Sequence, residues 1–253
     1  MSSCESCTIS CRRSPDSRRH THMHIGLIGT HDDSDLERKQ GTEIDLRSNL
    51  TFRNSYQFPI QNPVARRELL IGAALVLIPV IGWLLNMGHR IEMVHKMHHD
   101  QCAWPSWNGY KRLLKSGTTT FLGMIYYYIP GAVLSTIAIY LHQPWLLMPA
   151  VLLVAIATIA IPGYMTHYCL SYDAREIFDP VRAFSRVIQG GGLYWKAWAI
   201  ALSALALSFS GLLACGIGFL ATSVWFWQVA GFSFASVFTQ RFALDNTRQK
   251  KSE

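Results

Sequence analysis

Three histidines lie close together in the sequence at a spacing that suits metal binding. His95, His98 and His99 occupy positions i, i+3 and i+4, so their side chains would share one face of a helix. Neutral imidazoles arranged in this way can bind Fe or Zn, and His89 precedes them as a candidate upstream ligand. The spacing allows a metal site, but it is also typical of a polar helix end whose histidines stay in contact with water.

The stretch His95–His99 resembles one histidine box of the fatty-acid hydroxylase superfamily, whose members are membrane di-iron enzymes. Such a site needs histidines from several boxes, and the remaining candidates, His142 and His167, are isolated and far apart. We therefore favour a helix at the membrane surface whose histidines bind no metal. A metal-dependent oxidoreductase with Fe or Zn at these three histidines is the alternative. Otherwise no cofactor is expected, and no catalytic residue is assigned.

Composition places these residues in a membrane protein. The chain has 253 residues, of which 50% are hydrophobic and 15% charged, whereas soluble domains carry about 25% charged residues. No Asp, Glu, Lys or Arg occurs between Thr118 and Tyr172 or between Ala197 and Gln240. Apolar segments of that length are solvated by lipid, so they predict an all-α integral membrane protein.

Two helical hairpins are expected in the carboxyl-terminal half. Thr119–Leu141 and Trp145–Tyr168 are separated by only three residues, which predicts an antiparallel pair. Tyr194–Phe238 is too long for one span of about 20 residues, and it divides around Ser210–Gly211 and Cys215–Gly216 into two helices. The first of these carries a stripe of small residues, which predicts close helix packing. The stripe consists of Ala197, Ala201, Ala204, Ser208 and Gly211.

The first apolar stretch, Leu69–Gly88, is interrupted by Pro79 and Gly82, so it is either one kinked span or a hairpin that enters the membrane and returns. The basic residues favour one form. If the stretch crosses the membrane, ten Lys and Arg lie on one side and 13 on the other, but if it re-enters, all 23 lie on the cytoplasmic side. We therefore expect four transmembrane helices in two hairpins plus one re-entrant or interfacial helix, with five spans as the alternative.

This topology puts both termini in the cytoplasm, in a multi-pass protein of a prokaryotic inner or internal membrane. The net charge of +7 comes from basic residues that flank the apolar stretches, which favours anionic lipid headgroups over nucleic acid as the partner. Three parts are expected. Residues 1–60 form a disordered polar tail, residues 61–241 the helical membrane domain, and residues 242–253 a basic carboxyl-terminal tail.

A short amphipathic helix is expected between the two hairpins. Asp179 suits the N-cap and Pro180 the first helical position, while Gly190–Gly192 would end the helix. Apolar residues share one face and arginines lie elsewhere, so we expect this helix to lie on the inner leaflet.

A longer resemblance covers most of the apolar chain. Asn62–Ile91, with an Asn-Pro, an apolar run ending in Ile-Pro and a Gly before a polar helix, is similar to the start of the DUF4013 family of bacterial and archaeal membrane proteins. The family's Pro-Trp, amphipathic and Tyr-Pro elements correspond to Trp104–Trp107, Tyr110–Gly117 and Tyr127–Pro130. The resemblance extends to about Arg241 and implies a helical membrane architecture. The family has no established activity, so it implies no chemistry.

Three functions remain open at this point. We favour a non-enzymatic accessory or scaffold subunit that packs with a membrane protein or with itself. The sequence predicts no buried acid, no nucleophile–base pair and no phosphate-binding loop. The metal-dependent oxidoreductase is the second hypothesis. The third is a transporter of a neutral or lipid-like solute, because Pro79 breaks the first apolar stretch as transporter helices are broken.

Overall fold

The structure, a computed structural model, describes residues 44–213 and 216–242. Its α-helices are α2 (Phe52–Gln57), α3 (Pro63–Val76), α4 (Ile81–His98), α5 (Tyr110–Tyr140), α6 (Leu147–Ser171), α7 (Pro180–Ser208) and α8 (Ile217–Phe242). Short 3-10 helices lie between them: η2 (Phe58–Ile60), η3 (Pro144–Leu146), η4 (Ala174–Glu176) and η5 (Phe209–Leu213). The all-α prediction is confirmed for this part of the chain. Most of both predicted tails, residues 1–43 and 243–253, lies outside the described residues.

Residues 44–60 correct the predicted limit of the amino-terminal tail. Thr51 caps α2 by accepting a hydrogen bond from the backbone N–H of Asn54 at 3.1 Å. Leu50 and Phe58 are buried, and the Phe58 ring stacks on Phe232 of α8 with 4.4 Å between the centroids. The sequence predicts disorder up to residue 60, but these apolar side chains belong to the core, so the helical domain begins earlier.

The first apolar stretch folds as two helices that form a hairpin, α3–α4. The helices are separated by residues 77–80, of which Val80 has a positive φ of 64°. A Cβ on Gly82 would lie 1.7 Å from the carbonyl oxygen of Leu75, so only glycine allows this approach. One turn further along, Asn86 Nδ2 donates to the carbonyl oxygen of Gly72 at 3.1 Å. The chain therefore reverses direction, as the hairpin form of the prediction requires.

A pair of glycines lets α4 lie against α5. A Cβ on Gly88 would lie 1.9 Å from the carbonyl oxygen of Leu113, and a Cβ on Gly117 would lie 2.0 Å from that of Leu84. The two backbones therefore touch at reciprocal positions, without side chains between them. This contact fixes the polar half of α4 against the start of α5.

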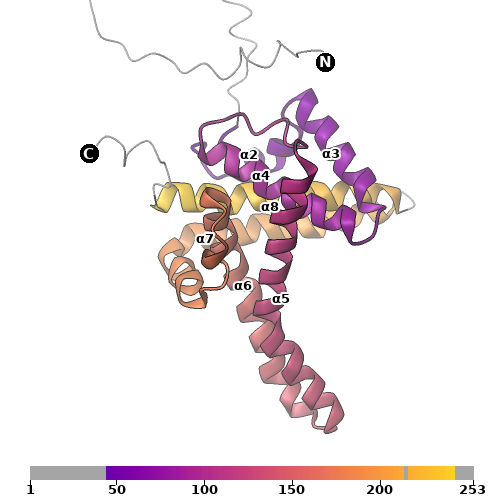
Figure 1. The fold of residues 1–253 in the computed structure, drawn as a ribbon, viewed down its shortest axis with the longest axis vertical. Helices are drawn as coiled ribbons and strands as arrows, with labels where there is room; N and C mark the ends of the chain where they lie inside the picture. The colour runs from indigo at the N-terminus through magenta and orange to yellow at the C-terminus, as the bar shows by residue number, and fades with distance from the viewer. Residues whose placement is uncertain (1–43, 214–215, 243–253) are drawn as a thin grey trace, which may run out of the picture. The chain divides into compact units, whose positions relative to one another are not determined.

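The predicted hairpin α5–α6 is confirmed. The turn between the helices includes His142, whose φ is 53°, and Tyr128 shares a hydrogen bond of 3.0 Å with Thr158 across the pair. A Cβ on Gly131 would lie 2.7 Å from Val154 Cγ2, so the helices approach closely at that level too. Figure 1 shows the far end of this hairpin extending away from the other helices.

The second hairpin, α7–α8, also follows the sequence pattern. Asp179 caps α7 by accepting from the backbone N–H of Arg182 at 3.0 Å, and the short helix predicted after Asp179 forms its first part. Gly191 then breaks the helix with φ 56° and ψ −141°, and a second helical part continues to Ser208. The stripe of small residues in this second part is buried against α8, so it serves helix packing.

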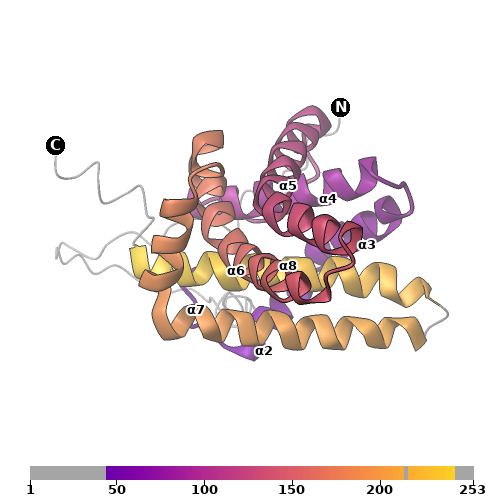
Figure 2. The ribbon, with the colours of Figure 1, turned by 90° about the horizontal axis from the view of Figure 1, so that it is seen from below.

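The two hairpins cross each other. In Figures 1 and 2 the second part of α7 and the whole of α8 run side by side, across the direction of α5–α6. Within the described residues, three helical stretches are long and apolar enough to cross a membrane: Tyr110–Tyr140, Pro144–Ser171 and Pro180–Leu213. These stretches fit a membrane protein. The four helices predicted to span, α5 to α8, do not form a bundle of parallel helices, because the two hairpins cross.

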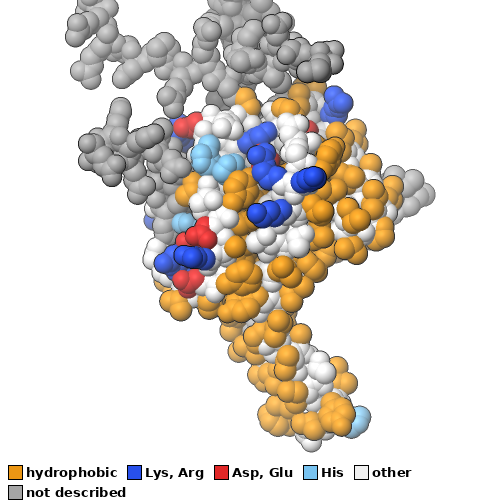
Figure 3. Space-filling model, viewed as in Figure 1, with side chains coloured by type: hydrophobic (Ala, Val, Ile, Leu, Met, Phe, Trp, Pro, Cys, Tyr) orange, Lys and Arg blue, Asp and Glu red, His pale blue; other side chains and the backbone are white. Residues whose placement is uncertain are grey.

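Charged side chains are unevenly distributed over the described surface. Figure 3 shows Lys, Arg, Asp and Glu on the part where the other helices meet, while the extending end of α5–α6 is almost entirely hydrophobic. Lys111, Arg112 and Lys115 lie at the start of α5, and Arg175 follows α6. Because α5 and α6 are antiparallel, these basic residues belong to the same end of the hairpin.

Candidate functional site

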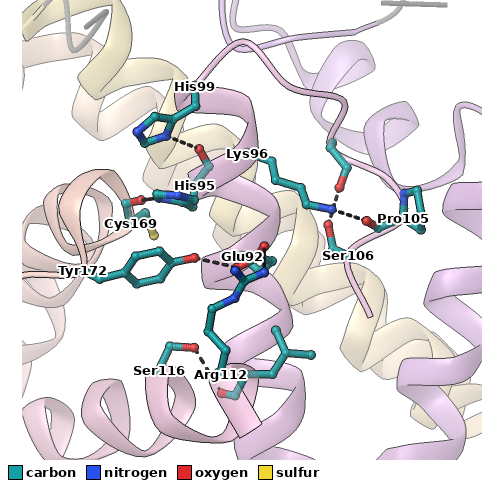
Figure 4. A network of polar contacts seen from close by, with 12 residues as sticks. Glu92, His95, Lys96, His99, Pro105, Ser106, Arg112, Ser116, Cys169 and Tyr172 are labelled. Atoms are coloured by element: carbon teal, nitrogen blue, oxygen red, sulfur yellow. Dashed lines mark hydrogen bonds and ion pairs between the residues drawn. The ribbon is translucent and has the colours of Figure 1, made fainter. Parts of the chain in front are cut away.

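The structure places the three candidate metal ligands at the end of α4 but does not aim them at one point. His95 Nδ1 lies 2.7 Å from the carbonyl oxygen of Cys169 on α6, and His99 Nδ1 lies 2.8 Å from the carbonyl oxygen of His95 (Figure 4). The two imidazoles lie side by side with 4.2 Å between centroids. His98 is buried and approaches Thr239 of α8, with 3.4 Å between Nδ1 and Oγ1.

These contacts do not support the metal-centre alternative. Among the described residues, no group of three or more His, Cys, Asp or Glu side chains lies at a spacing that could hold a metal ion. The predicted helix face does exist, but His98 contacts α8 while His95 contacts α6. Partial burial lowers the pKa of His95 below its ordinary 6.5, so its ring is neutral at neutral pH and its Nδ1–H donates to the Cys169 carbonyl.

Glu92 is the centre of a polar network on the same helix. Its side chain is buried, with Oε1 2.5 Å from Arg112 Nη2 and Oε2 accepting from the Tyr172 hydroxyl at 2.6 Å. Lys96, one turn further on, donates to the carbonyl oxygen of Pro105 (Figure 4). The network joins α4 to the start of α5 and the end of α6, where each charged group meets a partner.

A second buried acid lies in the α3–α4 hairpin. Glu68 Oε2 is 2.9 Å from His89 Nε2 and accepts from the backbone N–H of Ser106 at 2.7 Å. Trp107 donates from its indole N–H to the Glu68 carbonyl at 3.0 Å, and its ring stacks on His89 with 4.1 Å between centroids. Part of the Trp104–Trp107 element thus closes over a Glu–His pair. The contacts of His89 are with Glu68, Trp104 and Trp107.

Glu68 and Glu92 correct the expectation that the chain has no buried acid. Their side chains are only 6% and 4% exposed. The sequence contained a signal for the first of them. Ala65, Glu68 and Gly72 follow one another at helical spacing, so Glu68 lies on the apolar face of its helix, and all three residues are buried. Both acids have partners that satisfy them, which is the usual condition for a buried carboxylate.

The sequence did not indicate that Arg90 is a site residue, because it lies among other basic residues and histidines. It is buried, and its guanidinium carbon lies 4.7 Å from the centroid of the Trp227 ring. Its other polar contact is a weak one, 3.9 Å from Nη2 to Met165 Sδ. Burial lowers its pKa to about 10, so the group is still a cation at neutral pH.

Two cavities open beside Arg90. One, of about 260 Å³, is lined mainly by α4 and α8 and includes Trp83, Ser223 and Gln228. The other, of about 350 Å³, lies where α4 meets both hairpins and is lined almost wholly by apolar atoms. Arg90, Met124 and Trp227 line both. The arrangement places a cation between two cavities whose linings are mainly apolar.

Comparison with known proteins agrees with the architecture and adds no activity. Neither the curated proteins nor the solved structures include a match. The model of the family described as "Protein of unknown function (DUF4013)" matches residues 71–220. That range runs from within α3 into α8 and covers more than half of the chain. With the order of its helices and of its Gly, Pro and Trp elements, the chain belongs to the DUF4013 family.

Proposed function

We propose that this protein is a multi-pass membrane protein that acts as a non-enzymatic scaffold or accessory subunit and packs with a membrane partner through the α5–α6 hairpin. One observation carries the proposal: the far end of this hairpin extends beyond the other helices and exposes apolar side chains on both of its helices (Figures 1 and 3). They include Val133, Ile137, Tyr140, Met148, Val151 and Leu152. A surface of this kind and size is typical of contact with lipid or with another protein.

The polar groups of the site support a structural role. Glu92 and Glu68 are engaged by hydrogen bonds and ion pairs within the protein. His95 is held by the Cys169 carbonyl. A catalytic group has to reach a substrate, whereas these side chains join α3, α4, α5 and α6 to one another.

For topology, we propose that α5–α6 and α7–α8 lie in the bilayer, that α3–α4 is re-entrant or interfacial, and that both termini are cytoplasmic. The basic residues at the start of α5 and after α6 support this orientation, since Lys and Arg are retained on the cytoplasmic side. Because the hairpins cross (Figures 1 and 2), they do not both stand along the membrane normal. α7–α8 is therefore strongly tilted, or it lies near the interface.

Site-specific photo-crosslinking in intact membranes tests the scaffold role. A photoreactive residue at Val133 or Ile137, which are one turn apart on α5, is expected to capture the same protein, either a partner or a second copy. The same residue at Leu207, an exposed apolar position on α7, serves as the control and is expected not to capture it. Lipid adducts alone at both α5 positions would refute the scaffold proposal.

A transporter of a neutral or lipid-like solute is the second candidate, because the break between α3 and α4 lies beside a cavity. Val76 and Trp83, on either side of the break, both line the 260 Å³ cavity. Broken helices beside a binding cavity are a feature of transporters. Uptake into proteoliposomes would separate the two candidates. Transport of lipids or of neutral metabolites favours the transporter, and the absence of transport for both kinds of solute favours the scaffold.

A further inference from the structure

Arg90 is a buried cation without an anionic partner among the described residues. The ion pairs formed in this part of the chain involve Arg47, Arg112, Arg182, Arg186 and His89, but not Arg90. The ionisable groups that act on it electrostatically are Cys169 and Tyr164, a thiol and a phenol, which are ordinarily neutral at neutral pH. A buried charge left in this state is costly unless another group pairs with it.

The surrounding helices are built to hold this side chain in place. A Cβ on Gly231 of α8 would lie 3.0 Å from both Cγ and Cδ of Arg90, so the glycine leaves room for the alkyl part of the arginine. The guanidinium then lies over the face of Trp227, an attraction that offsets part of the cost of burial. Cation–π contact leaves the hydrogen-bonding edge of the guanidinium available, since Met165 is a weak acceptor.

A second polar group in the 260 Å³ cavity also needs a partner. Gln228 is 2% exposed, and neither its amide nitrogen nor its amide oxygen forms a hydrogen bond within the described residues. It lines the cavity together with Arg90. Buried amides are nearly always hydrogen-bonded. The lining of this cavity therefore includes a cation without an anionic partner and an amide without a hydrogen-bond partner among the described residues.

The 350 Å³ cavity continues from the same arginine into an apolar environment. Its lining comes from α4, α5, α6, α7 and α8 and includes Ile161, Leu205, Phe226 and Phe234. Its volume lies in the range of small-molecule sites, which begin at about 300 Å³. A single cation shared by two mainly apolar cavities is complementary to a molecule with one anionic head and a hydrocarbon chain.

We propose that Arg90, Gln228 and these two cavities form a binding site for one anionic amphiphile, with a carboxylate or phosphate head and an alkyl chain. The head lies between Arg90 and Gln228 in the first cavity, and the chain occupies the second. The planar guanidinium fork suits either anion, because it can donate two parallel hydrogen bonds to it. This inference does not rest on the scaffold role, which concerns the α5–α6 hairpin.

Binding to the purified, delipidated full-length protein in a non-ionic detergent tests the site. Radiolabelled oleate is compared with oleyl alcohol, which has the same chain and no charge. Phosphatidic acid is compared with dioleoylglycerol in the same way. We expect at least one of the two anions to bind once per chain and about tenfold or more tightly than its uncharged counterpart, as loss of a charge-assisted hydrogen bond implies. Preference for oleate identifies a free fatty carboxylate, and preference for phosphatidic acid a bilayer lipid.

Variants separate the site from the fold. Arg90→Gln is expected to weaken binding of the anion about tenfold or more and to leave binding of the uncharged counterpart unchanged. Arg182→Gln, which alters an arginine that is 62% exposed and paired with Glu176, is the matched control and should bind as the original protein does. Gln228→Leu removes the unsatisfied amide, so it should weaken binding of the anion without lowering the melting temperature.

The proposal is overturned if neither anion binds more tightly than its uncharged counterpart. It is also overturned if a folded Arg90→Gln protein, as judged by circular dichroism and gel filtration, binds the anion with the original affinity. If that variant does not fold, the comparison of charged and uncharged ligands on the unaltered protein still decides. Photo-crosslinking at Val133 reports on a different surface, so this site and the scaffold role can fail independently.

Discussion

Among single residues, Glu68 illustrates how a buried acid contributes to this fold. One carboxylate oxygen accepts both from His89 and from the backbone of Ser106. The neutral amide oxygen of Gln could accept from the same two donors, but both hydrogen bonds would lose the assistance of the negative charge. We expect Glu68→Gln to lower the free energy of unfolding by about 1–3 kcal/mol, because hydrogen bonds to a charged group contribute about 1.5–3 kcal/mol and those between neutral groups about 0.5–1.5 kcal/mol. Thermal unfolding in detergent would measure this loss as a lower melting temperature.

The corresponding exchange at Asp100, Asp100→Asn, is the control for Glu68→Gln. Asp100 is 35% exposed and pairs at 3.0 Å with Arg47, which is 59% exposed, and ion pairs at the surface contribute about 0–1 kcal/mol. Its replacement by Asn should therefore lower the melting temperature less. Equal losses for the two variants would show that the Glu68–His89 pair has no special weight.

The lowered pKa of His95 predicts how stability depends on pH. Desolvation by burial is the main cause of the shift below 6.5, so the unfolded chain binds a proton more readily than the folded protein does. Stability is then greatest above the unfolded pKa and decreases as the pH falls below about 6.5. Unfolding measured between pH 8 and 5 should show this decrease, and His95→Gln should make it shallower. The exposed His142→Gln is the control, and an identical slope in both variants would contradict the assignment.

Among elements, the contact of α4 with α5 depends on glycines that carry no side chain at the crossing. In Gly88→Ala, the new Cβ would lie 1.9 Å from the carbonyl oxygen of Leu113, and a backbone atom cannot move away as a side chain can. We expect the two helices to separate and the stability to fall by more than the about 1–3 kcal/mol typical of overpacking. Gly192→Ala meets no atom within 4 Å and should be tolerated. Similar folded yields for both variants would disprove the close contact.

The sequence predicted elements well where the cause is local. The hairpin turn at His142, the N-cap at Asp179 and the break near Pro79 each depend on neighbouring residues, and the structure confirms them. The site was harder to predict, because its contacts join residues far apart in the chain. Glu92 meets Tyr172, and Arg90 lies over Trp227. No periodicity or spacing along a single helix indicates such pairs.

For the whole molecule, the arrangement of charge predicts which ends of the helices share a side of the membrane. The start of α5 is basic and the segment after α6 contains arginines, while the turn between these helices holds no Lys or Arg. The cost of moving such cations across the bilayer predicts that both basic ends stay on the cytoplasmic side. In single-cysteine variants of a cysteine-free protein, labels at Lys111 and Ser252 should therefore react from the cytoplasmic face, and a label at Gln143 from the opposite face. Labels at Lys111 and Ser252 that react from opposing faces would rule out the even number of spans.

A label at Ser210, in the turn between α7 and α8, tests whether this second hairpin crosses the bilayer. If this label reacts from the same face as the label at Gln143, the tilted α7–α8 hairpin crosses the bilayer. If it reacts from the cytoplasmic face, the α7–α8 hairpin lies along the cytoplasmic interface and only the α5–α6 hairpin crosses.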